Sequence, residues 1–460
     1  MLQDLLSARK GDFKGHTELR AQTNATQKVT MLAGNMVENE QAAAGGVSAR
    51  VYRGGTYGFA AATEYSDEGV SKVLAAAEKN AALMDARAKR GMPPLPRAAP
   101  GKAALKAAPR GAVAQSLLID FAKALDGIVL EKYKGLSSRG VYVRALDIEK
   151  LLAVSDGFDS HSFMPRALVF VAMTADTADG DPVELEEGFG GLGKFDELFG
   201  DPAALVPRLD RLYEHLMKKH EGVHADAGVR KCVLHPKLAG MLAHEAVGHT
   251  VEADCVLGGS VGAGSLGKRV ASELVSMTDF AHAAFGKPCP LPVYVDDEGI
   301  EAEDAILIEG GILKGFMHSR ETAMRLGAKP QGHARAFEFS DEPLIRMRNT
   351  AIHPGKDKLG DMIASVDDGY FLVKTGNGQA DSTGEFTFSV NLAYEIKGSK
   401  LGRAVRETSI SGVAFEMLKT VDMVSDDMHW DCLGYCGKKQ WMPTADGGPA
   451  LRCDVNVGGR

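Results

Sequence analysis

The stretch LAHEAVGHTVEAD, residues 242–254, places His244, Glu245 and His249 close together in the sequence. A helix that carries H-E-x-x-H puts two histidines on one face, where they can hold zinc while the glutamate acts as a base. Zinc lowers the pKa of a bound water towards about 7 and polarises a carbonyl, which is the chemistry of amide hydrolysis. Here three residues separate Glu245 from His249. The bare pattern also arises by chance on solvated helices.

The spacing of the two histidines constrains the conformation of the backbone between them. Pro236 suits the first turn of a helix, and an apolar stripe after it predicts a helix over 236–252. In a regular helix, five residues turn the chain by about 500°, which leaves His244 and His249 about 140° apart. Both can meet one ion only if a π-bulge inserts a residue or the helix unwinds at Gly248. We therefore expect a distorted helix, with Gly248 as the easiest point of distortion.

A third ligand must come from elsewhere, because a catalytic zinc site has three protein ligands and one open position. The segment HWDCLGYCGKKQW, residues 429–441, offers Cys432 and Cys436 in a glycine-rich loop. Thiolates suit zinc, but a lone cysteine is more often a small buried apolar residue. The residues alone leave the choice between the two cysteines open.

The segment GAGSLGKR, residues 262–269, imitates two nucleotide-binding fingerprints. It satisfies G-x-G-x-x-G and nearly satisfies the phosphate-loop pattern. Both fingerprints need a strand just before the loop and a helix after it. Here a predicted helix precedes the loop, and Arg269 stands where the phosphate loop needs Ser or Thr. We expect a loop beside the active site and no nucleotide.

Composition narrows the class of protein. The chain has 460 residues, a net charge of −8, 45% hydrophobic and 25% charged residues, which is typical of a soluble globular protein. The negative charge argues against nucleic acid as a direct partner. The six cysteines lack the density of a disulfide scaffold, the first residues lack the apolar core of a signal peptide, and no apolar run approaches a membrane span. These features predict a cytoplasmic protein with no membrane contact.

The order of the predicted elements indicates an α+β fold. GGVSARVYRGGTYGFAAAT reads as a hairpin around a Gly-Gly turn, and many short strands follow residue 226. The C-terminal part is expected to be strand-rich and to carry the distorted zinc-binding helix. The predicted divisions are an N-terminal α+β domain (1–90), a Pro/Ala-rich linker (91–111), a middle α+β domain (112–225) and a strand-rich C-terminal domain that carries the candidate metal site (226–460).

Longer stretches resemble the TldD/PmbA family, the so-called modulators of DNA gyrase, in its active TldD branch. The resemblance starts with LHPKLAGMLAHEAVGHTVEAD and continues through VASELVSMTDF, IRMRNTAIHPGK, GNGQADSTGEFTFSVNLAYEI and CGKKQ. The N-terminal hairpin segment is similar to the family's opening segment. The resemblance covers most of the chain, most densely from residue 230 onward.

The resemblance implies a metallopeptidase of small or unfolded peptides, with one zinc per active subunit. Carried over onto this sequence, the ligands are His244, His249 and Cys436, and Glu245 is the base that activates a zinc-bound water. The family is α+β, with the metal site in the C-terminal part. The resemblance also implies a dimer, either with a second copy or with a PmbA-type subunit.

Two other functions stay open at this point. The chain could be a non-catalytic peptide-binding or partner subunit of such a complex, or a zinc hydrolase of non-peptide amides. The sequence also departs from the family pattern. The loop before Cys436 is about a residue shorter than expected, Cys432 is an extra thiol, and His333 replaces a different polar residue. We expect these changes to bear on the substrate more than on the chemistry.

Overall fold

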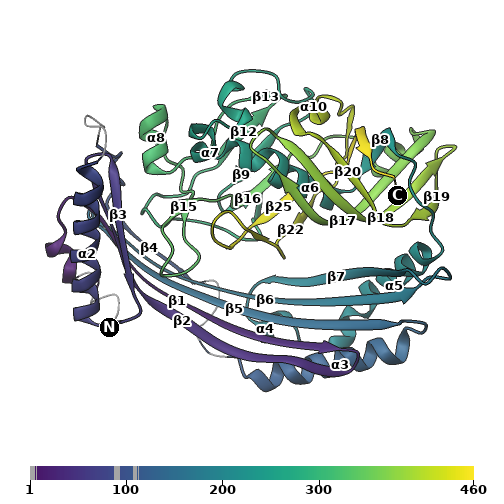
Figure 1. The fold of residues 1–460 in the computed structure, drawn as a ribbon, viewed down its shortest axis with the longest axis horizontal. Coiled ribbons are helices and arrows are strands. Elements are labelled where there is room, and N and C mark those ends of the chain that lie inside the picture. Colours follow the sequence, from purple (N-terminus) through teal and green to yellow (C-terminus); the bar gives the residue numbers. More distant parts are fainter. Residues whose placement is uncertain (1–5, 7, 88–93, 107–110, 112, 460) are drawn as a thin grey trace.

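The fold is seen in a computed structural model, which describes residues 6, 8–87, 94–106, 111 and 113–459. Parts of the predicted linker therefore lie outside the described residues. Helices and strands mix throughout, and the predicted α+β class is confirmed. A long curved sheet forms one side of the molecule, and a strand-rich C-terminal region lies against it (Figure 1).

The curved sheet contains seven strands in the order β3-β2-β1-β5-β6-β4, with β7 pairing with β6. Their bounds are β1 (His16–Leu32), β2 (Asn35–Arg53), β3 (Thr56–Ala62), β4 (Gly101–Lys106), β5 (Ser138–Val154), β6 (Phe158–Asp176) and β7 (Pro182–Leu192). The predicted hairpin is β2–β3. Its turn residues Gly54 and Gly55 both have positive φ, as a two-residue hairpin turn with the strand twist requires.

This sheet corrects the predicted division into separate N-terminal and middle domains. Strand β1 pairs with β5 along residues 18–32 and 140–154, so segments from both predicted domains form one continuous sheet. The predicted linker also contributes, because β4 pairs in parallel with β6. The predicted linker at 91–111 therefore does not separate two domains, because segments on both sides of it belong to one sheet.

Helices pack against the sheet at both of its ends. Their bounds are η1 (Arg9–Asp12), α2 (Asp67–Asp85), α3 (Gln115–Lys132), α4 (Phe195–Leu198), η2 (Pro202–Leu205) and α5 (Val206–His220). Helix α2 is capped by Ser66, whose side chain accepts a hydrogen bond from the amide of Gly69. It buries Val70, Val73 and Ala77 against the sheet. Helices α3 and α5 pack at the other end, over β5, β6 and β7.

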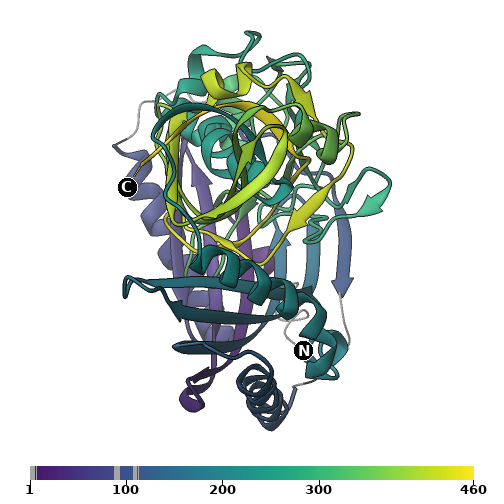
Figure 2. The ribbon, with the colours of Figure 1, turned by 90° about the vertical axis from the view of Figure 1, so that its right-hand side faces the viewer.

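The C-terminal region is built around a ring of strands. The sheet order β17-β8-β26-β20-β18-β19 carries an additional β17–β18 pairing, which closes five strands into a ring. Figure 2 looks into this ring and shows helix inside it. The strands are β8 (Gly228–Leu234), β17 (Asp368–Ala380), β18 (Glu385–Lys397), β19 (Lys400–Val405), β20 (Thr408–Val413), β21 (Met423–Val424) and β26 (Leu451–Val457).

A second sheet flanks the ring in the order β13-β12-β9-β16-β25-β22. Its strands are β9 (Met277–Phe280), β12 (Ala305–Glu309), β13 (Ile312–Leu313), β16 (Asn349–Ile352), β22 (His429–Asp431) and β25 (Ala445–Gly448). Three short pairs are β10 (Ala283–Ala284) with β11 (Lys287–Pro288), β14 (Ala334–Arg335) with β15 (Leu344–Ile345), and β23 (Tyr435–Cys436) with β24 (Met442–Pro443). The helices are α6 (Pro236–Leu242), η3 (Ala243–Gly248), η4 (His249–Val251), α7 (Ala253–Leu257), η5 (Val261–Gly264), α8 (Arg320–Leu326), α9 (Leu359–Ala364) and α10 (Ala414–Lys419).

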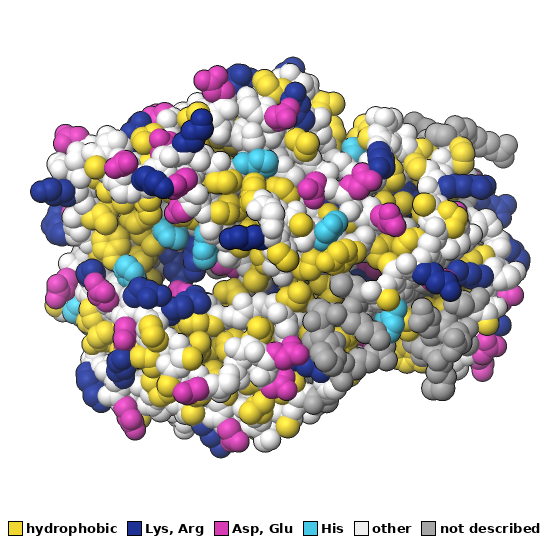
Figure 3. Space-filling view, turned by 180° about the vertical axis from the view of Figure 1, so that it is seen from behind, with side chains coloured by type: hydrophobic (Ala, Val, Ile, Leu, Met, Phe, Trp, Pro, Cys, Tyr) yellow, Lys and Arg dark blue, Asp and Glu magenta, His cyan; other side chains and the backbone are white. Residues whose placement is uncertain are grey.

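Polar and charged groups join the sheet to the C-terminal region. Buried Arg50 pairs with Glu18 on β1 and with Glu298 of the C-terminal region, at 2.7 and 2.6 Å. Lys150 on β5 pairs with Asp297 at 2.7 Å. Between the two parts the surface is hollowed, and Lys, Arg and His side chains gather around the opening (Figure 3). Among the described helices, none combines the length and apolar character that a bilayer crossing needs.

Candidate metal centre

The helix that carries the two histidines changes its winding where the extra residue falls. Pro236 opens α6, and His235 caps it by accepting a hydrogen bond from the amide of Lys237 at 3.2 Å. The next turn, η3, is π-helical. The amide of His249 donates to the carbonyl of His244, five residues back. This i→i+5 bond stacks the two histidines one turn apart, so the π-bulge, one of two expected distortions, is the one found.

The sequence predicted that Gly248 lets the helix distort, and this physical reason for the glycine is wrong. Gly248 keeps right-handed helical dihedrals, φ −53° and ψ −52°, so the helix does not unwind there. The residue must be small because of packing. A Cβ at this position would overlap the sulfur of Met347, which is fully buried, and would lie 3.2 Å from the carbonyl oxygen of Ala243.

Gly248→Ala is expected to lower the free energy of unfolding by about 1–3 kcal/mol, because the added methyl overpacks the core against Met347. The gain in helix propensity, about 1 kcal/mol, offsets only part of this. Urea denaturation of chelator-treated protein measures the effect without a metal contribution. In a Met347→Ala background the same Gly248→Ala change should cost less, because the added methyl then has room. An alanine at 248 that stabilises the protein would disprove the packing argument.

Three potential ligands meet above this π turn. The ligand atoms of His244, His249 and Cys436 all lie within 4.8 Å of one another. The two imidazole rings stand at 88° with centroids 5.3 Å apart, and the Cys436 sulfur lies 3.3 Å from Nε2 of His249. His244 and Cys436 are buried, and His249 is about three-quarters buried. The fold thus gathers all three residues that the sequence comparison with the family singled out.

The residues alone left open whether Cys432 or Cys436 is the third ligand. The structure places the two cysteines differently. Cys436 lies on β23, paired with Met442 on β24, and its carbonyl accepts a 2.6 Å hydrogen bond from Arg346. Cys432 lies outside the cluster, against Gly191 of β7. Burial raises the pKa of the Cys432 thiol to about 11, so it stays protonated at neutral pH.

Electrostatics favour a thiolate at Cys436. Burial alone would raise the pKa of this thiol, but hydrogen bonds and charges from His244 and His249 outweigh it and lower the pKa to about 4. In the same cluster, burial opposes protonation of His249, while Glu252 and Cys436 favour it and raise its pKa to about 10. A cation held by these donors would displace such protons, because metals bind thiolate and neutral imidazole.

A buried carboxylate orients one imidazole, and the sequence analysis missed it. Oε2 of Glu252 lies 2.8 Å from Nδ1 of His249, which leaves Nε2 facing Cys436. Glu252 is fully buried, and Lys438 balances its charge at 3.1 Å while also contacting Asp254. Carboxylate–histidine pairs of this kind fix ring orientation at metal sites. The i, i+3 spacing of His249 and Glu252 was a usable signal, since such residues face each other on a helix.

Glu245 is placed beside the cluster and does not belong to it. Its Oε2 is 3.9 Å from Nε2 of His249, and its side chain is 30% exposed, whereas His244 is 4% exposed. It shares the π turn with both histidines, so the same backbone that brings the imidazoles together also holds this carboxylate at their edge. A base in this position can reach a water molecule beside the cluster.

The residues fit a zinc ion. Two imidazoles and a thiolate are donors that zinc prefers, and three of them leave a position for water or substrate. Nδ1 of His244 is buried and has no hydrogen-bond partner within the described part of the chain, so protein contacts do not use up every donor. With Glu252 behind one histidine and Glu245 at the edge, the arrangement has the donors and the carboxylate that a metal-dependent hydrolase needs.

Two other sequence features lie outside this centre. His333 is fully buried, and its Nε2 lies 3.0 Å from Asp279 in a polar network that also holds Arg348. The expectation that His333 bears on the substrate is therefore corrected, because it supports the fold. The glycine-rich segment at 262–269 follows helix α7 through a short loop, so the strand that a nucleotide fingerprint needs is replaced by a helix.

Comparisons with known proteins agree with this class. Residues 227–459 match the PmbA/TldA metallopeptidase C-terminal domain, and residues 17–81 match the PmbA/TldA metallopeptidase domain 1. A metalloprotease of Methanothermobacter thermautotrophicus is 30% identical over 452 residues, covering 96% of this chain and 95% of that protein. A zinc metalloprotease TldD homolog of Saccharolobus solfataricus is 34% identical over 253 residues, 55% of this chain and 56% of that protein.

The fold is also known. The crystal structure of TldE from Thermococcus kodakarensis superposes with a TM-score of 0.78 at 18% identity, covering 100% of both chains. That likeness concerns the fold alone. Together with the matched domains and the relative that spans the whole chain, it leads to one identification: the chain belongs to the TldD/PmbA family of metallopeptidases.

Proposed function

We propose that the protein is a zinc-dependent peptidase that hydrolyses small or unfolded peptides. The observation that carries the proposal is the cluster of His244, His249 and Cys436, whose ligand atoms lie within 4.8 Å of one another beside Glu245. When bound there, zinc polarises the scissile carbonyl and makes water a stronger acid. Glu245 takes a proton from the attacking water and returns it to the leaving amine.

The surroundings of the cluster support extended substrates. The loop that leads to Cys436 lies against the curved sheet, where Arg166 donates to the carbonyl of Cys432 and a Cβ on Gly188 would lie 2.5 Å from Leu433. This loop is thus held between both parts of the molecule. We infer that this confinement favours an extended peptide over a folded protein as substrate.

Removal and return of metal test the proposal. We expect chelator-treated protein, freed of the chelator, to lose peptide hydrolysis, and about one equivalent of zinc to restore it, because the described residues place one thiolate and two imidazoles around a single metal position. Mass spectrometry of products from an unfolded protein and from short peptides gives the readout. Elemental analysis gives the metal content. Full hydrolysis by protein that contains no metal would refute the proposal.

The assembly and location expected from the sequence stay predictions. They are a homodimer or a heterodimer with a PmbA-type subunit, in the cytoplasm. Light scattering of the purified chain, alone and mixed with a PmbA-type protein, measures the first of these.

A further inference from the structure

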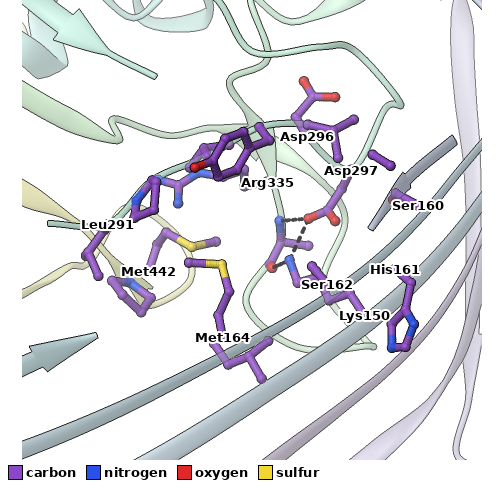
Figure 4. Close-up of a pocket in the computed structure, with 18 of the residues that line it drawn as sticks. Lys150, Ser160, His161, Ser162, Met164, Leu291, Asp296, Asp297, Arg335 and Met442 are labelled. Carbon is purple, nitrogen blue, oxygen red and sulfur yellow. Dashed lines mark hydrogen bonds and ion pairs between the residues drawn. The ribbon is translucent and has the colours of Figure 1, made fainter. Parts of the chain in front are cut away.

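A cavity of about 510 Å³ lies between the curved sheet and the C-terminal region, next to the Cys436 hairpin. This volume is within the range of small-molecule and side-chain pockets. Its walls are mostly apolar. Met164 from β6 and Met442 from β24 reach towards each other, and Leu291 lies near them (Figure 4). Ile148 and Val293 extend the apolar wall.

The polar groups on one side of the cavity satisfy one another. Lys150 donates to Asp297 at 2.7 Å and to the carbonyl of Ala336 at 2.6 Å, as the dashed lines in Figure 4 show. Asp296 accepts three backbone amide hydrogen bonds, from Glu298, Ile300 and Ala334. These acids therefore have partners and do not need a ligand.

Two arginines in the same lining do not have acidic partners. Arg335 donates to the carbonyl of Met347, and Arg166 donates to the carbonyl of Cys432, but no carboxylate within the described residues forms an ion pair with either. Nε of Arg335 and both Nε and Nη1 of Arg166 are buried without a hydrogen-bond partner in that part of the chain. Burying a charge is costly unless it is paired, so this imbalance needs a physical reason.

Arg335 lies near two further arginines, Arg346 and Arg348, and near Asp279 and Asp297, which already pair with Arg348 and Lys150. Burial, together with neighbouring Arg346 and Arg348, lowers the pKa of Arg335 to about 10, which still leaves it charged at neutral pH. Arg346 itself is bonded only to carbonyls, those of Cys436, Lys438 and Gln440, as far as the described residues show. An anion in the cavity would compensate this charge, and the apolar walls would strengthen the attraction by excluding water.

The cavity is joined to the metal centre through the hairpin. Met442 lines the cavity and is the strand partner of Cys436. Arg166 lies over the ring of Tyr435, with its Cζ 4.9 Å from the ring centroid. Residues that pair across a hairpin are about 5 Å apart, so one wall of the cavity is formed by the strand partner of the residue that supplies the ligand thiolate.

We propose that this cavity receives the C-terminal residue of the peptide substrate, with an apolar side chain against Met164 and Met442 and the α-carboxylate facing Arg335. The inference rests on the proposed function for the identity of the ligand. Arg335 makes the contact, and Arg166 acts through its charge. The ligand chemistry is thus an apolar group next to a carboxylate, and a peptide supplies both at its C-terminal end.

The first test needs no variant in the cavity. Two dye-labelled hexapeptides that end in leucine, one as the free acid and one as the amide, are titrated against the zinc-loaded Glu245→Gln protein, which should bind peptides without cleaving them. We expect the free acid to bind at least about tenfold more tightly, since hydrogen bonds to charged groups are the strong ones. Affinities within twofold of each other would overturn the proposal.

The second test moves to the protein. Arg335→Met should bring the two affinities within twofold of each other by weakening binding of the free acid. Arg403→Met is the matched control, because Arg403 is exposed on β19 and pairs with Glu395; it should keep the preference for the free acid. If Arg335→Met does not fold, Met164→Trp, which fills the cavity from β6, should weaken the free acid at least tenfold. Retention of full affinity in the Trp variant would also overturn the proposal.

The outcomes separate this inference from the proposed function. Zinc-dependent hydrolysis with no preference for the free acid would remove the cavity's role and leave the peptidase intact. A strong preference that depends on Arg335, in a protein that cleaves no peptide with zinc bound, would support the cavity's anion site and refute the peptidase.

Discussion

Replacing Glu245 by Gln is expected to lower kcat/KM for peptide hydrolysis by about 10²–10⁴-fold, the usual contribution of a general base. The amide side chain has nearly the same shape but cannot accept and return a proton. Zinc content should not change, because the Glu245 carboxylate lies beside the cluster of His244, His249 and Cys436 and is not one of its donors. The variant therefore separates chemistry from metal binding.

Elemental analysis and product mass spectrometry on the same preparation check both halves of this expectation. Glu273→Gln is the matched control, since Glu273 is exposed and lies outside the cluster; it should keep the hydrolysis rate. Near-normal turnover by the Glu245→Gln protein would mean that another group accepts the proton. Loss of zinc in that variant would mean that Glu245 is a ligand.

The backbone at the centre shows what sequence periodicity can and cannot predict. The start at Pro236 and the need for a distorted turn between His244 and His249 follow from helix geometry, and the π turn meets that need. The part played by Gly248 did not follow. Its neighbour Met347 is 99 positions away, and contacts between such distant segments leave no local pattern.

The same limit applies to the curved sheet. The local alternation of apolar and polar residues in β2 and β3 predicts their hairpin, and Gly54 and Gly55 form its turn. The pairing of β1 with β5 joins segments more than a hundred residues apart, so composition suggested two domains where hydrogen bonding makes one sheet. A proline- and alanine-rich stretch looked like a linker, although residues 101–106 in it form a strand.

Some of the charged residues around the metal centre could be predicted from the sequence. Glu252 follows His249 at a helical spacing and could have been identified, and Lys438 lies two residues after Cys436. The arginines at 166, 335 and 346 carry no such signal, because they come from distant elements and contact mainly backbone carbonyls. The choice of Cys436 over Cys432 came from resemblance to a family. In the structure it follows from which thiol the β23–β24 hairpin turns towards the imidazoles.

The second large expected effect is on zinc affinity, and it tests which of two cysteines only four residues apart is the ligand. Cys436→Ser should weaken zinc binding by roughly 10²-fold or more. Structural zinc sites with four ligands bind with about 10–16 kcal/mol, or roughly 3 kcal/mol per donor, and about 1.4 kcal/mol corresponds to a factor of ten. A serine hydroxyl stays protonated at neutral pH and cannot replace the thiolate. At micromolar zinc, the rate of hydrolysis should fall together with the metal content of the variant.

Cys432→Ser is the matched control for this change. The Cys432 thiol is protonated, with its pKa raised to about 11 by burial, and it lies against Gly191 and not against the imidazoles. Competition with a chromophoric chelator measures zinc affinity in both variants, and thermal unfolding shows whether each retains its fold. We expect Cys432→Ser to keep zinc affinity and hydrolysis. If the two variants exchanged these behaviours, Cys432 would be the ligand, and the hairpin would have to turn over when zinc binds.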